Sequence, residues 1–263
     1  MRIPLSEGEV YEVFLSAIGD NIHGCEVYWE RECRSTMDEA KQLVCEGAKL
    51  PFLYGVDAQL RGRGRKGHSW GHAAGGLAVT IALESVAHAR ECTGLSLVVG
   101  VSLVSLLHRY GIASRLKWPN DLLEGDSMRK VGGILIELVE RDGQYVPLVG
   151  IGMNIGAAPE DVPEAAGVSI PVGSAACAGL VAAELLAYDA RFRVEGIASI
   201  ESAFMDCVAF LEEPVEFFVG EVRHQGVFKG INAEGWLLVE EDGEERAYHT
   251  AEYLRRIERV TSI

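Results

Sequence analysis

The sequence predicts an α/β or α+β fold dominated by sheet, followed by a small all-β region at its C-terminal end. As far as Leu211, short apolar segments rich in β-branched residues alternate with segments of helical length. Beyond Leu211 the segments are short, β-rich and separated by glycine or acidic turns. We therefore expect two domains, one over residues 1–211 and one over residues 212–263.

The first domain is expected to begin with a strand, a helix and a second strand. Glu26–Arg31 alternates between apolar and polar residues, which predicts a strand. Ser35 is a good residue for a helix N-cap, and Gly47 is placed to end that helix. Phe52–Asp57 then predicts a strand that runs into a loop at Gln59.

The same reasoning places the remaining elements. In the first domain, strands are expected at Ala78–Leu83, Ser114–Lys117, Val131–Val139 and Tyr145–Ile151, and helices at Leu95–Tyr110, Ser174–Ser199 and Glu201–Leu211. In the second, strands are expected at Val215–Val219, Val227–Ile231, Trp236–Val239 and Arg246–His249. Asp142-Gly143 is a typical hairpin turn, so the last two strands of the first domain should pair.

Composition and charge exclude several classes of protein. The 263 residues carry 24 Lys and Arg against 39 Asp and Glu, a net charge of −15 that disfavours general binding of nucleic acid. Six cysteines without a CxxC pair are interpreted as reduced core thiols, not as a zinc site. The chain start lacks the pattern of a signal peptide, and the most apolar window, Leu95–Leu107, is too short to span a bilayer. We expect a cytoplasmic protein that binds no membrane.

A basic, glycine-rich loop at Gln59–Trp70 is the electrostatic exception, with four cations and no acid. Its GxGxxG string, beginning at Gly62, matches the dinucleotide fingerprint and comes near the phosphate-binding P-loop. Both motifs require a helix to open at the last glycine, and the glycines among residues 69–77 make that helix improbable. A solvated loop or an RNA contact stays an alternative. A small phosphate- or carboxylate-bearing ligand fits better, because glycines let backbone N–H groups approach and arginines bind anionic oxygens bidentately.

Two further strings suggest a cleft. KWPND, residues 117–121, places Trp118 in extended geometry before a proline and then turns the chain. KVGGILIE, residues 130–137, has paired glycines at the entrance of an apolar strand, which usually marks the close approach of a ligand or another backbone. We therefore expect Lys130 to point into a cleft, and backbone clearance for ligands at Gly62, Gly64, Gly132 and Gly133.

Together these strings resemble the biotin protein ligases, also called biotin–acetyl-CoA-carboxylase ligases. The resemblance rests on Ser35-Thr36, Gln59 followed by GRGRKG, KWPND, KVGGILIE, GIGMN at residues 150–154 and GINAEGWLLV near the C-terminal end. It implies an α+β fold: a biotin/lipoate-ligase-like catalytic domain with a mixed central sheet flanked by helices, plus a small C-terminal β-barrel.

The resemblance also implies a reaction. Biotin is adenylated by ATP to biotinyl-5′-AMP, with Mg²⁺ on the triphosphate, and biotin is then transferred to a lysine of a biotin carboxyl carrier protein or domain. The alternative is a lipoate or other carboxylate–protein ligase of the same fold, although Gln59 with GRGRKG favours biotin. Some family members repress transcription through an added N-terminal helix-turn-helix, but about 25 residues before Glu26 are too few for such a domain. The chain is expected to be a monomer or homodimer.

The resemblance implies the site residues. Lys130, Arg65 and Asp121 are expected to be catalytic. Biotin is expected to be bound by Ser35, Thr36, Met37, Gln59, Gly62, Arg63, Gly64, Arg65, Lys130 and Gly133. ATP is expected to be bound by Arg65, Lys66, His68, Trp70, Lys117, Asn120 and Asn154, and no residue is assigned to a metal.

These roles have physical reasons and open alternatives. Lys130 and Arg65 would neutralise the biotin carboxylate and the ATP phosphates, two anions that the reaction brings together. Asp121 would orient or deprotonate the acceptor lysine. Ser35 can equally be a helix cap, Trp70 core packing and Asp121 a turn residue. The chain departs from the family pattern at His68, Met37 and Ala73-Ala74, so ATP affinity or retention of the adenylate is expected to be weaker. It also has a slightly longer hairpin at Glu124–Met128.

Overall fold

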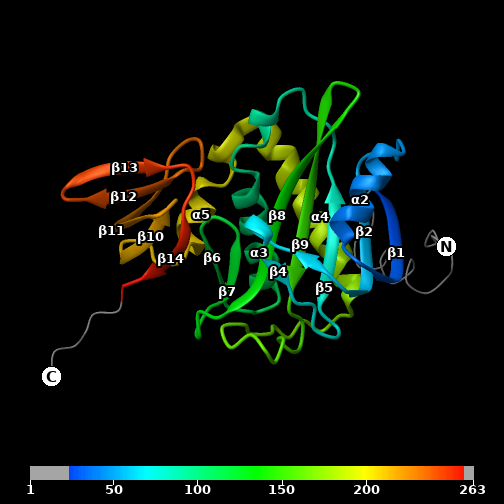
Figure 1. Cartoon of the computed structure of the whole chain (residues 1–263), viewed down its shortest axis with the longest axis horizontal. Helices are drawn as coiled ribbons and strands as arrows, with labels where there is room; N and C mark the ends of the chain where they lie inside the picture. The colour runs from blue at the N-terminus through cyan, green and yellow to red at the C-terminus, as the bar shows by residue number, and fades with distance from the viewer. Residues whose placement is uncertain (1–23, 258–263) are drawn as a thin grey trace.

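The computed structural model describes residues 24–257 and is built around a seven-stranded mixed sheet (Figure 1). The chain start, expected to lack a signal peptide, lies outside these residues, as do residues 1–23 of the first predicted domain and residues 258–263 of the second. The strands are β1 (Glu26–Cys33), β2 (Phe52–Gln59), β5 (Leu77–Ala82), β6 (Ser114–Lys117), β7 (Asp121–Glu124), β8 (Lys130–Arg141) and β9 (Gln144–Met153). Their order is β1-β2-β5-β9-β8-β7-β6; β1 and β2 are parallel and the other neighbours antiparallel. The predicted mixed sheet is confirmed.

Helices cover both faces of this sheet, as predicted. They are α2 (Thr36–Cys45), α3 (Leu95–Arg109), α4 (Ser174–Glu195) and α5 (Glu201–Cys207). Alternation along β5 separates the faces, because Val79 belongs to the core with α3 and α4 whereas Ala78 packs in the cluster that contains Met37 and Leu43 of α2. The functional pocket described below lies beside the first turn of α2.

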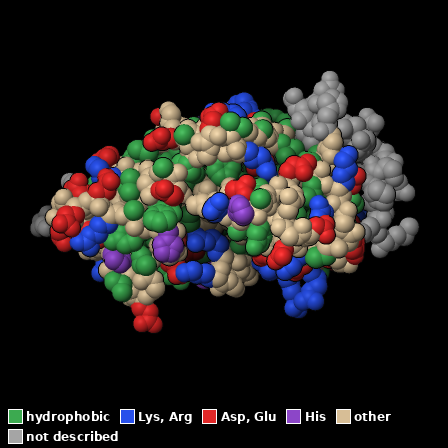
Figure 2. All heavy atoms as spheres, turned by 90° about the horizontal axis from the view of Figure 1, so that it is seen from above, with side chains coloured by type: hydrophobic (Ala, Val, Ile, Leu, Met, Phe, Trp, Pro, Cys, Tyr) green, Lys and Arg blue, Asp and Glu red, His purple; other side chains and the backbone are tan. Residues whose placement is uncertain are grey.

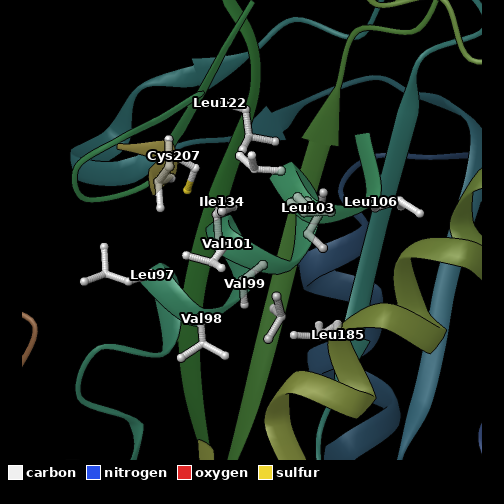
Figure 3. Close-up of a cluster of buried hydrophobic side chains, with 14 of the residues drawn as sticks. Leu97, Val98, Val99, Val101, Leu103, Leu106, Leu122, Ile134, Leu185 and Cys207 are labelled. Carbon is white, nitrogen blue, oxygen red and sulfur yellow. The ribbon is translucent and has the colours of Figure 1, made fainter. Parts of the chain in front are cut away.

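The α3 side of the sheet forms the larger core. Figure 3 shows Val98, Val99 and Val101 of α3 gathered with Ile134 of β8 and Leu185 of α4. With the preceding turn, the segment Ala89–Arg109 is long and apolar enough to cross a membrane by length and composition, and 61% of its most apolar window is buried inside the protein. The prediction that the apolar run at Leu95–Leu107 is too short to span a bilayer is therefore wrong by length and composition, because the run is part of a longer segment. In the structure the apolar residues of that run pack in the core.

A five-stranded antiparallel sheet stands where the small β-barrel was expected (Figure 1). Its strands are β10 (Pro214–Val219), β11 (Val222–Ile231), β12 (Leu237–Glu241), β13 (Glu244–Tyr248) and β14 (Glu252–Arg256), in the order β13-β12-β11-β10-β14. Phe217 and Leu254 belong to the same core as α3, and the buried Trp118 Nε1 donates to the carbonyl of Gly235 at 3.1 Å. The division at residue 211 stays a prediction.

Several local predictions are confirmed. Asp142 and Gly143 have φ of 54° and 75° and join β8 to β9, as a primed hairpin turn requires. The predicted hairpin at Glu124–Met128 connects β7 to β8. No helix opens after Gly67 in the basic loop; short strands β3 (Gly62–Arg63) and β4 (Ser69–Trp70) enclose a single helical turn, η2 (Arg65–Gly67).

Other predictions need correction. Ser35 caps α2 through its backbone carbonyl, which accepts from Asp38 and Glu39, and its side chain makes no cap hydrogen bond. Asp121 begins β7, a strand that the sequence did not predict because KWPND reads as a turn. The cysteines are free, but Cys45 is exposed and so is not a core thiol. Burial raises the pKa of the Cys177 thiol to about 12.

Candidate functional site

A cavity of about 320 Å³ opens beside the first turn of α2, a volume within the usual range for small-molecule sites. Its walls come from α2, the end of β2, the basic loop, β5, β8, β9, the turn before β7 and the start of β14. Of the predicted site residues, all but Gly62 and Asn154 line it: Ser35, Thr36, Met37, Gln59, Arg63, Gly64, Arg65, Lys66, His68, Trp70, Lys117, Asn120, Asp121, Lys130 and Gly133. Strings far apart in the sequence therefore meet in one pocket.

One end of the pocket is neutral and polar. Gln59 Oε1 accepts from the backbone N–H of Thr36 at 2.9 Å and from Thr36 Oγ1 at 3.2 Å. Thr80 Oγ1, fully buried on β5, donates to Thr36 Oγ1 at 2.9 Å. This chain of bonds fixes three side chains against one another and gives this end of the cavity neutral donors and acceptors. Sequence analysis missed Thr80, which sits within an otherwise apolar strand.

Glycines form the floor of the pocket. A Cβ at Gly152 would lie 2.4 Å from the Trp70 ring, and one at Gly150 would lie 2.7 Å from Met37 Cε. Because Gly152 faces Gly133 across β8 and β9, the indole of Trp70 can lie flat against the sheet. Trp70 thus packs on the protein and also lines the pocket.

At Gly132 and Gly62, the space left by the missing side chain is filled by other protein atoms and not by a ligand. A Cβ at Gly132 would meet Leu122 at 2.9 Å and the carbonyl of Gly152 at 3.0 Å. A Cβ at Gly62 would meet the Gln59 amide and the backbone of Trp70, both at 2.6 Å. The prediction that Gly132 leaves space for a ligand is therefore wrong, because that space is filled by Leu122 and the Gly152 backbone. At Gly62 the absence of a side chain leaves room for the Gln59 amide.

The other end of the pocket is cationic. Lys130 Nζ lies 2.6 Å from Asp121 and 5.7 Å from the centre of the Trp70 ring, within cation–π range. Lys117 Nζ lies 3.3 Å from the second oxygen of Asp121. Asp121 therefore bridges two ammonium groups, and its place on β7 holds both toward the cavity.

Two loop arginines are held in different ways. Arg63 pairs with Asp38 at 2.9 Å and with Glu137 at 3.0 Å. Arg65 instead donates to the neutral side-chain oxygen of Asn120 at 3.1 Å, while the Asn120 amide donates to the carbonyl of Ile134 at 2.9 Å. Arg65 is thus oriented without losing its charge to a carboxylate, which suits it to an anionic ligand. Figure 2 shows Lys, Arg and His side chains near the middle of the upper face.

A stretch of the C-terminal sheet completes the pocket and was missed from the sequence. Ala251–Leu254 lines the cavity, and Glu252 forms an ion pair with Lys66 of the basic loop. The sequence EYLRR carries three charges in five residues, so it lacks the apolar alternation that identifies a strand. Its contact with a loop 186 residues away depends on the fold alone.

Asn154 lies beside the pocket, buried, with its side-chain amide donating to the carbonyl of Ala166 at 3.1 Å. Its backbone N–H donates to Val131, and its carbonyl accepts from Val168. These bonds fasten the segment after β9 next to the strand that carries Lys130. Binding of adenine by Asn154 stays a prediction, because the residue does not line the cavity.

The donor set bears on how Mg²⁺ would bind. Among the described residues, no group of three or more His, Cys, Asp or Glu side chains could hold a metal ion, and the carboxylates that line the pocket are Asp121 and Glu252. Mg²⁺ in nucleotide sites is commonly held by one or two carboxylates together with substrate phosphates. The pocket therefore fits an ion that enters with a polyphosphate, not a resident metal.

The mixed sheet and its pocket define a class of protein: one that holds a small anionic molecule in a cation-lined cleft beside a neutral polar end. A sequence model of the biotin/lipoate A/B protein ligase family matches residues 29–154. The biotin–[acetyl-CoA-carboxylase] ligase of Paracoccus denitrificans is 33% identical over 195 residues, which cover 69% of this chain and 80% of that protein. The chain belongs to this ligase family.

Other relatives agree on the family and the fold. The bifunctional ligase/repressor BirA of Escherichia coli K12 is 34% identical over 203 residues, or 72% of this chain, although the match spans 61% of that longer protein. A biotin protein ligase from Aquifex aeolicus, solved in complex with biotin and ATP, has a TM-score of 0.73 at 23% identity and covers 88% of this chain and 99% of that one. This likeness shows a shared fold.

Proposed function

We propose that the protein is an ATP-dependent ligase that adenylates biotin to biotinyl-5′-AMP and transfers biotin to a lysine of a carboxylase carrier domain. The observation that carries this proposal is a single cavity with a neutral hydrogen-bonding end and a cationic end. Biotin has a neutral ureido ring and a carboxylate, and ATP adds phosphates beside that carboxylate. The named relatives support the same assignment.

The neutral end suits the ureido ring. Thr36, Gln59 and Thr80 are already joined by hydrogen bonds, so little order has to be gained when a ligand binds. Gln59 Oε1 is occupied by Thr36, which leaves the Gln59 amide N–H groups as donors toward a urea oxygen. Ser35, which is 2% exposed, and Met37 close this end of the cavity.

The cationic end suits the first chemical step. The biotin carboxylate attacks the α-phosphorus of ATP, an acyl–phosphate bond forms and pyrophosphate leaves. Negative charge then concentrates on the phosphate oxygens, and Lys130 and Arg65 are placed to stabilise it. Arg63, Lys66 and Lys117 add positive charge along the same wall, and Mg²⁺ bound with ATP would neutralise the triphosphate further.

The second step needs a neutral amine. The acceptor lysine attacks the acyl carbon of biotinyl-5′-AMP, an amide bond forms, AMP leaves and the amine loses a proton. Asp121 is the carboxylate between Lys130 and Lys117, so it lies beside the cations that would hold the adenylate. We assign to it the orientation and deprotonation of the incoming amine. The carrier domain as acceptor, the cytoplasm as location and a monomer or homodimer as assembly stay predictions.

Pyrophosphate release tests the proposal directly. The protein is incubated with ATP and biotin, and separately with ATP and lipoate or octanoate. Release with biotin is expected; release with lipoate alone would instead indicate the other ligase specificity of the family. Lys130→Ala should abolish release, while Lys229→Ala, which removes a lysine paired with Glu212 in the small sheet, should leave it unchanged. Equal activity of the two variants would refute the role of Lys130.

A further inference from the structure

The start of β14 is shaped to reach the pocket. Glu216 and Phe218 of β10 pair with Arg255 and Glu252, so β14 has one residue more than its partner over this stretch. Tyr253 lies within the bulge, with φ of 55° and 64% exposure. The bulge lets Ala251 and Leu254, only three residues apart, both pack into the core while Glu252 faces the basic loop. Bulges often re-aim a side chain beside a functional site.

Glu252 and Lys66 bring opposite charges together inside the cavity wall. The Glu252 side chain is 26% exposed and the Lys66 side chain 49% exposed, and both residues line the pocket. Lys66 sits at the tip of the loop in the left-handed region, with φ of 52°. The ion pair therefore links the small sheet to the loop whose cations line the pocket.

The pair opposes anion binding in two ways. The cavity wall carries five cations, Arg63, Arg65, Lys66, Lys117 and Lys130, and the two carboxylates Asp121 and Glu252. Asp121 lies between Lys117 and Lys130. Glu252 neutralises the charge of Lys66 and also places its own negative charge at this end of the pocket. A triphosphate entering this end meets a cation already neutralised and an anion beside it.

We propose that Glu252 is a positioning residue that holds Lys66 in the free protein and sets a limit on ATP affinity by competing with phosphate for the Lys66 ammonium. The inference rests on the proposed function, because it takes ATP as the ligand of the cationic end. Binding of ATP exchanges one oxygen anion for another at Lys66 and releases the start of β14 from the loop. The small sheet thereby responds to the occupancy of the pocket.

The test measures ATP binding to the full chain by calorimetry. Glu252→Gln keeps the size of the side chain and removes its charge, and partly exposed ion pairs of this kind contribute about 0.5–1 kcal/mol, so ATP should bind about two- to five-fold more tightly. Biotin affinity should not change, and the gain should shrink as ionic strength rises. Glu252→Ala repeats the test, and thermal unfolding checks that each variant is folded.

Two comparisons make the test specific. Glu213→Gln breaks a similarly exposed pair with Arg256, 3.2 Å apart and outside the pocket lining, and should leave ATP affinity unchanged. In a Lys66→Ala background the gain from Glu252→Gln should be clearly smaller, because Glu252 then has no ammonium to withhold from phosphate and only its direct repulsion of the phosphates remains. Weaker ATP binding by Glu252→Gln, or the same gain with and without Lys66, would overturn the proposal. ATP binding is measured separately from pyrophosphate release, so the two proposals can fail independently. If Glu252→Gln binds ATP more tightly but the protein does not adenylate biotin, the proposed function is refuted and the role of Glu252 is not.

Discussion

The contact between Gly152 and Trp70 gives the sharpest test of the pocket floor. A methyl group at Gly152 would lie 2.4 Å from Trp70 Cε2 and 2.5 Å from Nε1, about 1 Å closer than ordinary contact. Gly152 lies in β9, paired on both sides by β5 and β8, so the strand cannot move aside. Gly152→Ala therefore has to displace the indole toward the cavity.

The cost follows from that displacement. Overpacking of a rigid site costs about 1–3 kcal/mol, so the free energy of unfolding should fall by that amount. The displaced ring would enter the cationic end and lose its place beneath Lys130, whose cation–π contact is worth about 0.5–1 kcal/mol. Because the displaced ring occupies the cationic end and shifts Lys130, a loss of about 0.5–1 kcal/mol in ATP binding predicts that KM for ATP rises about two- to five-fold, whereas KM for biotin changes little.

Two measurements check this reasoning: chemical denaturation, and pyrophosphate release as ATP is varied. Gly71→Ala is the matched control, because its Cβ would make only ordinary contacts, 3.5 Å from Pro159, beside the same tryptophan. Replacing Trp70 by Leu should restore much of the stability lost in Gly152→Ala, since the smaller side chain removes the clash. An equal stability loss with and without the indole would refute the account.

Three further predictions concern single groups. Asp121→Asn should spare adenylate formation and slow transfer to the acceptor, as single-turnover assays of each half-reaction can resolve; equal loss in both would contradict its role. Thr36→Val leaves the buried Thr80 hydroxyl without its acceptor, so the free energy of unfolding should fall by about 1–3 kcal/mol. KM for biotin should rise as well, and an unchanged KM would show that Thr36 does not bind biotin. Hydrogen bonds from Arg223 and Arg255 lower the pKa of Glu216 from 4.5 to about 2. A carboxyl with a lowered pKa stabilises the fold above its unfolded pKa and loses that effect as pH falls, so wild-type stability should drop more steeply than that of Glu216→Gln between about pH 5 and 2; parallel curves would refute it.

Local signals accounted for much of the fold and the site. Asp142-Gly143 defined a hairpin because only a few residues tolerate positive φ at both turn positions. The glycines after Gly67 excluded a helix and with it the two phosphate motifs that need one. These inferences succeeded because each depends on the conformational range of a few adjacent residues.

What the sequence could not supply is the register between distant elements. Asp121 and Lys130 meet because β7 and β8 pair with a shift between Leu122 and Leu123, and no pattern in either strand encodes that shift. Glu252 reaches Lys66 only through a bulge in a strand too charged to be recognised. Partners of charged side chains are therefore the part of the site that required the structure.

The hydrogen bond from Trp118 to Gly235 has a consequence for how the protein unfolds. Trp118 is 3% exposed in the intact protein, so removing the small sheet would take away the acceptor of its indole N–H, the carbonyl of Gly235. It would also uncover the side of the main core that Phe217 and Leu254 now close. A chain truncated after residue 211 should aggregate instead of folding alone, and the intact protein should melt in one cooperative transition, because both sheets share a single hydrophobic interior.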